Sequence, residues 1–159
     1  MVIGICKLCN KQTELIKAHI IPECFYRLDL YSGEIPRLVS NTAGTYPKRA
    51  PIGVYDENIL CGPCDQEIGI YDQHACELLI RNVGQFSKRL SDDGRPMFLS
   101  VPHFDYNKLK LFLMSILWRA GISDQKFFDR VSLGPFLDKL HSMIVNKDPL
   151  AIVKHLPVF

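Results

Sequence analysis

Four cysteines, arranged as two Cys-x-x-Cys pairs, are the residues of this chain best suited to carry chemistry. The pairs are Cys6 with Cys9 and Cys61 with Cys64, and 51 residues separate one pair from the other. Four thiolates in two such pairs form the closed tetrahedral site that structural zinc prefers, with no position left open for a catalytic water. The spacing therefore predicts a structural Zn²⁺ ion held by both pairs.

The second pair has an alternative interpretation as a redox-active dithiol. The run Cys61-Gly62-Pro63-Cys64 places Gly-Pro between the thiols, as in thioredoxin-like motifs. That interpretation gives the first pair no role, so we favour the metal site. The two remaining cysteines, Cys24 and Cys76, have no partner at this spacing, and we interpret them as small buried hydrophobic residues.

A histidine and a carboxylate stand at chemically useful places beside the two pairs. His19 lies in the run Ala18-His19-Ile20-Ile21-Pro22, where residues 14–21 read as a β-segment that Pro22 ends. Asp65 directly follows the last cysteine, at the start of a segment with helical apolar spacing. A neutral imidazole can take a proton from water near pH 7, and a carboxylate can hold Mg²⁺.

These residues together resemble the HNH, or ββα-metal, endonuclease superfamily in its zinc-stapled treble-clef branch. In that branch one Cys-x-x-Cys precedes a hairpin that carries the histidine, and the second opens the helix; the match covers residues 1–90 at most. The resemblance implies a divalent-metal-dependent endonuclease that hydrolyses DNA phosphodiesters. It implies His19 as general base, Asp65 as a ligand of a catalytic Mg²⁺ or Mn²⁺ ion, and His74 in the place of the family's final histidine. The whole chain is also similar to uncharacterised bacterial HNH-like proteins, and such small nucleases often serve in phage or defence systems.

One position departs from the family pattern. The usual second metal ligand immediately precedes the histidine, and here that residue is Ala18, whose methyl group cannot bind a cation. Candidates for a substitute ligand are Glu67, Asp72, His74 and Glu77. The alternative function is a catalytically inactive zinc-binding module for nucleic-acid or protein interaction.

The expected fold is α+β: the resemblance implies a treble-clef, ββα-metal core stapled by zinc, and hydrophobic periodicity predicts a helical C-terminal extension. Residues 1–95 form the predicted HNH-like domain, and residues 96–159 form the helical extension packed on it. The expected elements are a helix over 65–90, a turn at 91–96, helices over 104–120 and 134–145, a short helix over 124–131, and a strand over 152–159.

Composition sets wider limits on function. The chain has 159 residues, 47% of them hydrophobic, and a net charge of only +2, so no strongly basic footprint marks a nucleic-acid surface. Cations that can reach phosphates include Lys48 and Arg49. No apolar run is long enough to span a bilayer, and we expect a cytoplasmic protein. DNA is the expected partner. The apolar faces of the C-terminal helices are interpreted first as core packing against the helix that begins at Asp65; the alternative is a docking surface for a protein partner or a second copy, which exposed Trp118 and Arg119 would suit.

Overall fold

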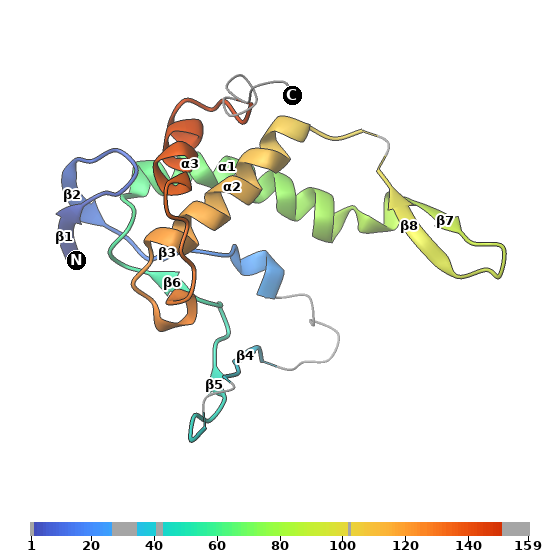
Figure 1. The fold of residues 1–159 in the computed structure, drawn as a ribbon, viewed down its shortest axis with the longest axis horizontal. Coiled ribbons are helices and arrows are strands. Elements are labelled where there is room, and N and C mark those ends of the chain that lie inside the picture. Colours follow the sequence, from blue (N-terminus) through green and yellow to red (C-terminus); the bar gives the residue numbers. More distant parts are fainter. Residues whose placement is uncertain (1, 27–34, 41–42, 102, 151–159) are drawn as a thin grey trace.

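Across the part of the chain that the structure describes, three α-helices combine with four two-stranded sheets, which is compatible with the expected α+β class (Figure 1). The computed structural model describes residues 2–26, 35–40, 43–101 and 103–150. The strands are β1 (Val2–Ile5), β2 (Gln12–Leu15), β3 (Ala18–His19), β4 (Arg37–Leu38), β5 (Lys48–Arg49), β6 (Tyr55–Asp56), β7 (Ser87–Leu90) and β8 (Pro96–Ser100). The helices are α1 (Gly62–Cys76), α2 (Tyr106–Ile122) and α3 (Phe136–Val145), and the short helical turns are η1 (Glu23–Tyr26), η2 (Glu77–Arg81), η3 (Val83–Gln85) and η4 (Lys126–Phe128).

The N-terminal hairpin of β1 and β2 carries the first cysteine pair in its turn. The amide of Cys6 donates to the carbonyl of Lys11 at 3.0 Å, and the amide of Asn10 donates to the carbonyl of Cys6 at 2.8 Å. Asn10 closes this turn at φ 57°, in the left-handed region that asparagine tolerates better than most residues. The turn therefore points both thiols of the pair to the same side.

The predicted β-segment over 14–21 is divided in the structure between two sheets. Its first part belongs to β2, and β3 pairs instead with β6 in antiparallel register, with Ala18 opposite Asp56 and His19 opposite Tyr55. The helix α1 follows β6 closely in the chain and begins with Gly62 and Pro63, and proline in the first turn loses no helical hydrogen bond. His19 therefore lies in a two-stranded sheet of β3 and β6, and α1 follows the second of these strands.

The helix expected over 65–90 is shorter in the structure, which corrects that prediction. α1 ends at Cys76, and η2 and η3 follow before the chain becomes the extended strand β7. The apolar spacing continues past this point, but Ser87–Leu90 pair with β8 instead of extending the helix. The expected turn at 91–96 is the tip of this hairpin, closed by the amide of Ser91 donating to the carbonyl of Arg95 at 2.9 Å.

The core draws side chains from both halves of the chain. In its larger cluster Ile68 of α1 packs with Ile20, with Trp118 of α2 and with Ile144 of α3. The predicted boundary between residues 95 and 96 falls at the exposed tip of the β7–β8 hairpin, which extends away from the helices (Figure 1). The strand expected over 152–159 lies outside the described residues.

Trp118 and Arg119 are buried, each with 1% of its surface exposed. Their burial agrees with the interpretation of this helix as core packing, and the alternative that places these two residues on an exposed interface is wrong. The large apolar side chains that α2 does expose include Leu113 and Leu117. Helical spacing made both faces of α2 apolar, so the pattern alone did not show which face lies inside.

A disulfide joins η1 to the end of α1. Cys24 and Cys76 are bonded, with their Cα atoms 6.2 Å apart, inside the usual range for a disulfide. The structure thus corrects the interpretation of these two residues as unconnected buried thiols. None of the described helices combines the length and hydropathy that a membrane-spanning segment needs.

Candidate functional site

The two cysteine pairs converge on one point. The Sγ atoms of Cys6, Cys9, Cys61 and Cys64 all lie within 4.8 Å of one another, close enough to hold a metal ion. The sulfurs of Cys9 and Cys61 are 4.0 Å apart. Zn–S bonds of about 2.3 Å in a tetrahedron place sulfurs about 3.8 Å apart, so the observed cluster has the size that a zinc ion needs.

Backbone hydrogen bonds hold the two pairs side by side. The amide of Lys7 donates to the carbonyl of Ile59 at 2.8 Å, and the amide of Ile16 donates to the carbonyl of Leu60 at 3.0 Å. The amide of Cys61 donates to the Cys6 sulfur at 3.4 Å. The segment just before α1 is thus fixed against the N-terminal hairpin without help from any ion.

The protonation of the cluster is uneven in the absence of metal. Burial raises the pKa of the Cys6 thiol, but hydrogen bonds from the backbone at Cys9, Cys61 and Leu8 outweigh it and bring the pKa to about 7. Burial raises the pKa values of the Cys61 and Cys64 thiols. The Cys6 thiolate therefore forms readily near neutral pH, while a bound cation would favour deprotonation of Cys61 and Cys64.

His19 presents an unsatisfied ring nitrogen beside this cluster. Its Nε2 atom is buried and has no hydrogen-bond partner in the described part of the chain. Its ring lies edge-on to that of Tyr55, with 6.4 Å between the centroids. Buried polar atoms are nearly always paired, so an unpaired one indicates a missing water, ion or ligand at that point.

Arg119 fixes the backbone at His19. Its guanidinium donates to the His19 carbonyl at 2.7 Å and to both carboxylate oxygens of Asp72, at 2.8 and 2.7 Å. Two further bonds reach the carbonyl and the hydroxyl of Ser115, at 3.3 and 3.2 Å. One buried side chain thus ties β3 to α1 and α2, in the bidentate geometry that arginine forms with a carboxylate.

Asp65 stands at the first turn of α1, within electrostatic reach of His19. Burial raises the pKa of its carboxyl group, while the charge of Arg119 lowers it, that of Asp72 raises it, and that of His19 lowers it. Asp65 and His19 are therefore near enough to interact electrostatically.

His74 does not share this location. It lies nine residues after Asp65 in α1, which corresponds to about 13 Å along the axis and the opposite side of the helix. Its Nε2 is also buried without a partner in the described residues, and it interacts electrostatically with Asp105. Membership of His74 in one metal site with Asp65 does not fit this geometry.

The other candidate substitutes for the ligand missing at Ala18 are engaged elsewhere. Asp72 binds Arg119, Glu67 forms an ion pair with Lys147 at 2.7 Å, and Glu77 accepts a hydrogen bond from Gln73 at 2.9 Å. Across the described ranges, the four cysteines form the one group of three or more ligand-type side chains. Asp65 is thus the carboxylate that remains for a second ion near His19.

Sequence reasoning missed two buried charged residues that organise this region. Arg119 stood in an apolar helical pattern, and a lone arginine on such a face is a signal of a buried pair. Asp56 is fully buried and accepts hydrogen bonds from the Ser123 hydroxyl at 2.7 Å and the Asp124 amide at 3.3 Å. No local pattern around Asp56 pointed to partners so far along the chain.

No family model matches this chain, and neither the curated proteins nor the solved structures gave a match.

Proposed function

We propose that this chain is a zinc-stapled, HNH-like endonuclease that hydrolyses DNA phosphodiesters with the help of a divalent metal ion. One observation carries the proposal: the unpaired Nε2 of His19, on a strand next to the helix that begins at the second cysteine pair, lies within electrostatic reach of Asp65. The treble-clef assignment of the core, with zinc as the ion between the four cysteines, is part of this proposal.

His19 acts as the general base in this mechanism. With Nε2 unprotonated, the imidazole accepts a proton from a water molecule, whose oxygen then attacks the phosphorus and displaces the leaving oxygen. Arg119 holds the His19 carbonyl, so that the ring keeps its position while it gains charge. The Asp72 carboxylate pairs with Arg119 and so holds the guanidinium in place against the His19 carbonyl.

Asp65 would hold the divalent ion of the reaction. Mg²⁺ keeps several waters and commonly takes only one or two carboxylates together with substrate phosphates, so the single carboxylate found here fits such a site. The ion supplies charge stabilisation at the leaving oxygen. Burial disfavours the charged form of the Asp65 carboxyl, so a bound cation lowers the pKa of that group again.

A second candidate function is a zinc-binding module that binds nucleic acid or protein without cleaving it. The observation that favours it is the engagement of Asp72 by Arg119, together with Ala18 at the position of the usual ligand. A site with one carboxylate binds its cation weakly. The four-cysteine site does not include that carboxylate, so a protein without activity would keep its fold. Both candidates share the four-cysteine site and differ only in chemistry at His19.

A nicking assay separates the two. Supercoiled plasmid incubated with the protein and Mg²⁺ or Mn²⁺ is expected to be nicked, with the loss of about two orders of magnitude or more in His19→Ala. The matched control is His103→Ala, which removes an exposed histidine and is expected to leave the rate unchanged. Asp65→Asn is expected to raise the metal concentration that is needed. Absence of nicking by the unmodified protein on supercoiled, linear and branched DNA would favour the module.

DNA is the proposed partner of the endonuclease, whereas the module would bind nucleic acid or protein. A protein partner or second copy that uses the C-terminal helices stays a prediction, now with the exposed Leu113 and Leu117 of α2 in place of the buried Trp118 and Arg119.

A further inference from the structure

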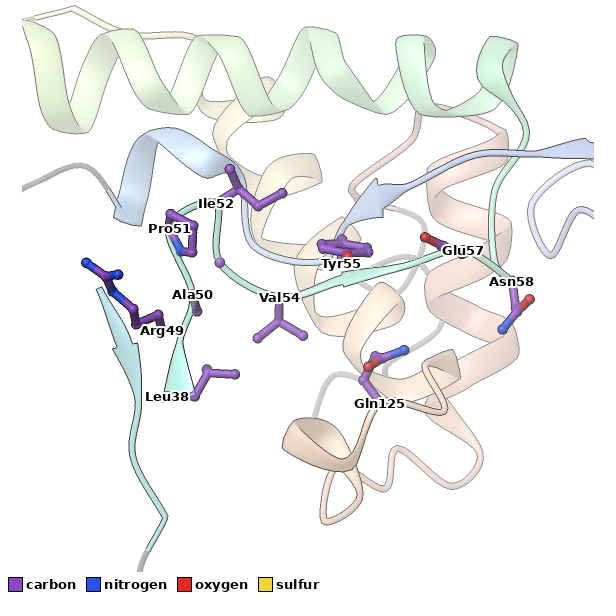
Figure 2. A pocket seen from close by; sticks show the side chains of 11 residues that line it. Leu38, Arg49, Ala50, Pro51, Ile52, Val54, Tyr55, Glu57, Asn58 and Gln125 are labelled. Atoms are coloured by element: carbon purple, nitrogen blue, oxygen red, sulfur yellow. The ribbon is translucent and has the colours of Figure 1, made fainter. Parts of the chain in front are cut away.

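A pocket of about 610 Å³ opens at β6, and Tyr55 in its lining is the strand partner of His19 (Figure 2). It lies between the β4–β5 hairpin, the turn that precedes β6, β6 itself, and the segment at Gln125. Its volume is in the range of about 300–1,000 Å³ that is typical of small-molecule sites. None of the residues considered above for catalysis or for the four-cysteine site lines it.

The wall before β6 has a defined shape. Gly53 adopts φ +77°, and its amide donates to the carbonyl of Ala50 at 3.0 Å, which closes a tight turn. A Cβ atom at this position would lie 2.0 Å from the ring of Tyr26, so only glycine allows that ring to pack here. The next residue, Val54, is buried and lines the pocket.

The opposite wall is held by the buried carboxylate of Asp56. It accepts hydrogen bonds from the Asn58 amide at 2.9 Å and from the Ser123 hydroxyl at 2.7 Å. The Ser123 hydroxyl in turn accepts from the Gln125 amide at 3.1 Å. The backbone at the two amide-bearing residues Asn58 and Gln125 is therefore fixed, while their side chains face the pocket region (Figure 2).

The lining has the chemistry of a nucleobase site. Leu38, Ile52 and Val54 offer apolar surface for the faces of a flat ring. The side chains of Asn58 and Gln125 each carry donors and an acceptor, which match the mixed edge of a base. The exposed guanidinium of Arg49 can meet the phosphate that follows such a base.

Tyr55 connects this pocket with His19. It lines the pocket, and its ring lies 6.4 Å from the His19 ring between centroids. The Nζ of Lys17 lies 5.1 Å from the centroid of the Tyr55 ring, which places a positive charge beside this tyrosine. Tyr55 therefore belongs both to the pocket lining and to the surroundings of His19.

We propose that the pocket receives one unstacked base of the DNA strand whose phosphate lies at His19. This inference rests on the proposed function for the position of the phosphate. Enzymes that read or modify a base outside the stack hold it in a pocket of this kind, by contacts with its faces and its edge. The pocket would then give the protein a base preference, whereas net charge affects only attraction that is independent of sequence.

Binding of short single-stranded oligonucleotides, measured by fluorescence anisotropy without added Mg²⁺, tests the inference independently of cleavage. We expect a series with A, C, G or T at one position to differ in affinity by about tenfold between best and worst. An abasic site at that position is expected to bind at least as weakly as the worst base. The Asn58→Ala/Gln125→Ala variant is expected to bind all four bases alike, whereas Asn107→Ala/Gln85→Ala, with exposed amides elsewhere, keeps the preference.

A second variant guards against loss of the fold. Ile52→Trp fills the pocket from its partly exposed rim, and we expect it to bind like the abasic case while its thermal unfolding stays unchanged. Equal affinity for intact and abasic strands, or no binding at all, would overturn the inference. Base preference without nicking would overturn the proposed cleavage alone, and nicking without base preference would overturn the pocket alone.

Discussion

Arg119 shows how one buried side chain positions the proposed site. It makes five hydrogen bonds, to His19, Asp72 and Ser115, and only 1% of its surface is exposed. A buried charge is costly unless it is paired and hydrogen-bonded, and Arg119 is both paired with Asp72 and hydrogen-bonded. The pair therefore specifies how β3, α1 and α2 meet, whatever its net contribution to stability.

Replacement of Arg119 tests this arrangement. Arg119→Ala leaves Asp72 and the His19 carbonyl without their partner, and we expect the free energy of unfolding to fall by about 3–5 kcal/mol in urea titrations. The Arg119→Met/Asp72→Leu double variant removes both charges and is expected to lose less than Arg119→Ala alone. Arg130→Ala, at an exposed arginine, is the control and should change stability by less than about 0.5 kcal/mol. A double variant as unstable as the single one would contradict the pairing.

Asp65 predicts a distinctive dependence of stability on pH. Burial raises its pKa in the folded protein, so above the ordinary value of about 3.9 the folded state keeps a proton that the unfolded state has lost. Stability contributed by that proton is therefore lost as the pH rises through the folded pKa. We expect the stability of Asp65→Asn relative to the unmodified protein to increase with pH across this window.

Urea unfolding between pH 4.5 and 8, without divalent ions, measures that difference. Asp129→Asn, at an exposed carboxylate, serves as the control and is expected to show no such trend. A difference for Asp65→Asn that stays constant or shrinks with rising pH would show that the group is not buried as described.

At the scale of elements, the disulfide between Cys24 and Cys76 fastens η1 to the end of α1. It closes a loop with a sequence separation of 52, and such a cross-link typically stabilises a fold by about 2–4 kcal/mol. The ring of Phe25 next to Cys24 stacks on Phe112 of α2, with 5.5 Å between centroids. The turn is thus held by one covalent bond and one aromatic contact.

Counting thiols tests this bond. Alkylation of the unfolded, metal-free protein is expected to label the four free cysteines before reduction and all six afterwards, as read by intact mass. Cys24→Ser and Cys76→Ser should each lower the free energy of unfolding by about 2–4 kcal/mol under non-reducing conditions and leave it unchanged relative to the reduced protein. Six labels before reduction would refute the disulfide.

Local patterns predicted the elements better than their limits and partners. The two Cys-x-x-Cys spacings and the extended segment around His19 were sufficient to place the cysteine cluster and the histidine near the start of α1. The end of α1 was not predictable, because the apolar spacing that continues beyond Cys76 suits a helix, and only pairing with β8 makes Ser87–Leu90 a strand. The bond from Arg119 to His19 spans 100 residues and could not be read from local spacing.

At the scale of the whole molecule, the four cysteines join the N-terminal hairpin to the helical core. Their side chains belong to the larger core cluster or pack against it, so an ion held there would stabilise the fold as a whole. The larger core cluster also extends to α3, so apolar packing stabilises the fold alongside any bound ion. We therefore expect loss of the ion to weaken the fold without abolishing it.

Cys9→Ser tests this expectation with little disturbance of packing, because Cys9 is the least buried of the four. Zinc retained after dialysis, measured by mass spectrometry of the metal, is expected to fall from a single ion per chain to a small fraction of that. The thermal midpoint should fall with it. Cys24→Ser, at a cysteine outside the cluster, should retain zinc in full. Equal zinc content in the Cys9→Ser protein would contradict the four-thiolate site.

Cys64 and Asp65 are consecutive residues in the first turn of α1. A cation bound by one and a cation bound by the other therefore act on the same short piece of backbone. Thermodynamic linkage would make such an influence mutual: whatever factor occupancy of the thiolate site imposes on cation binding at the carboxylate, the carboxylate site imposes on the thiolates in return.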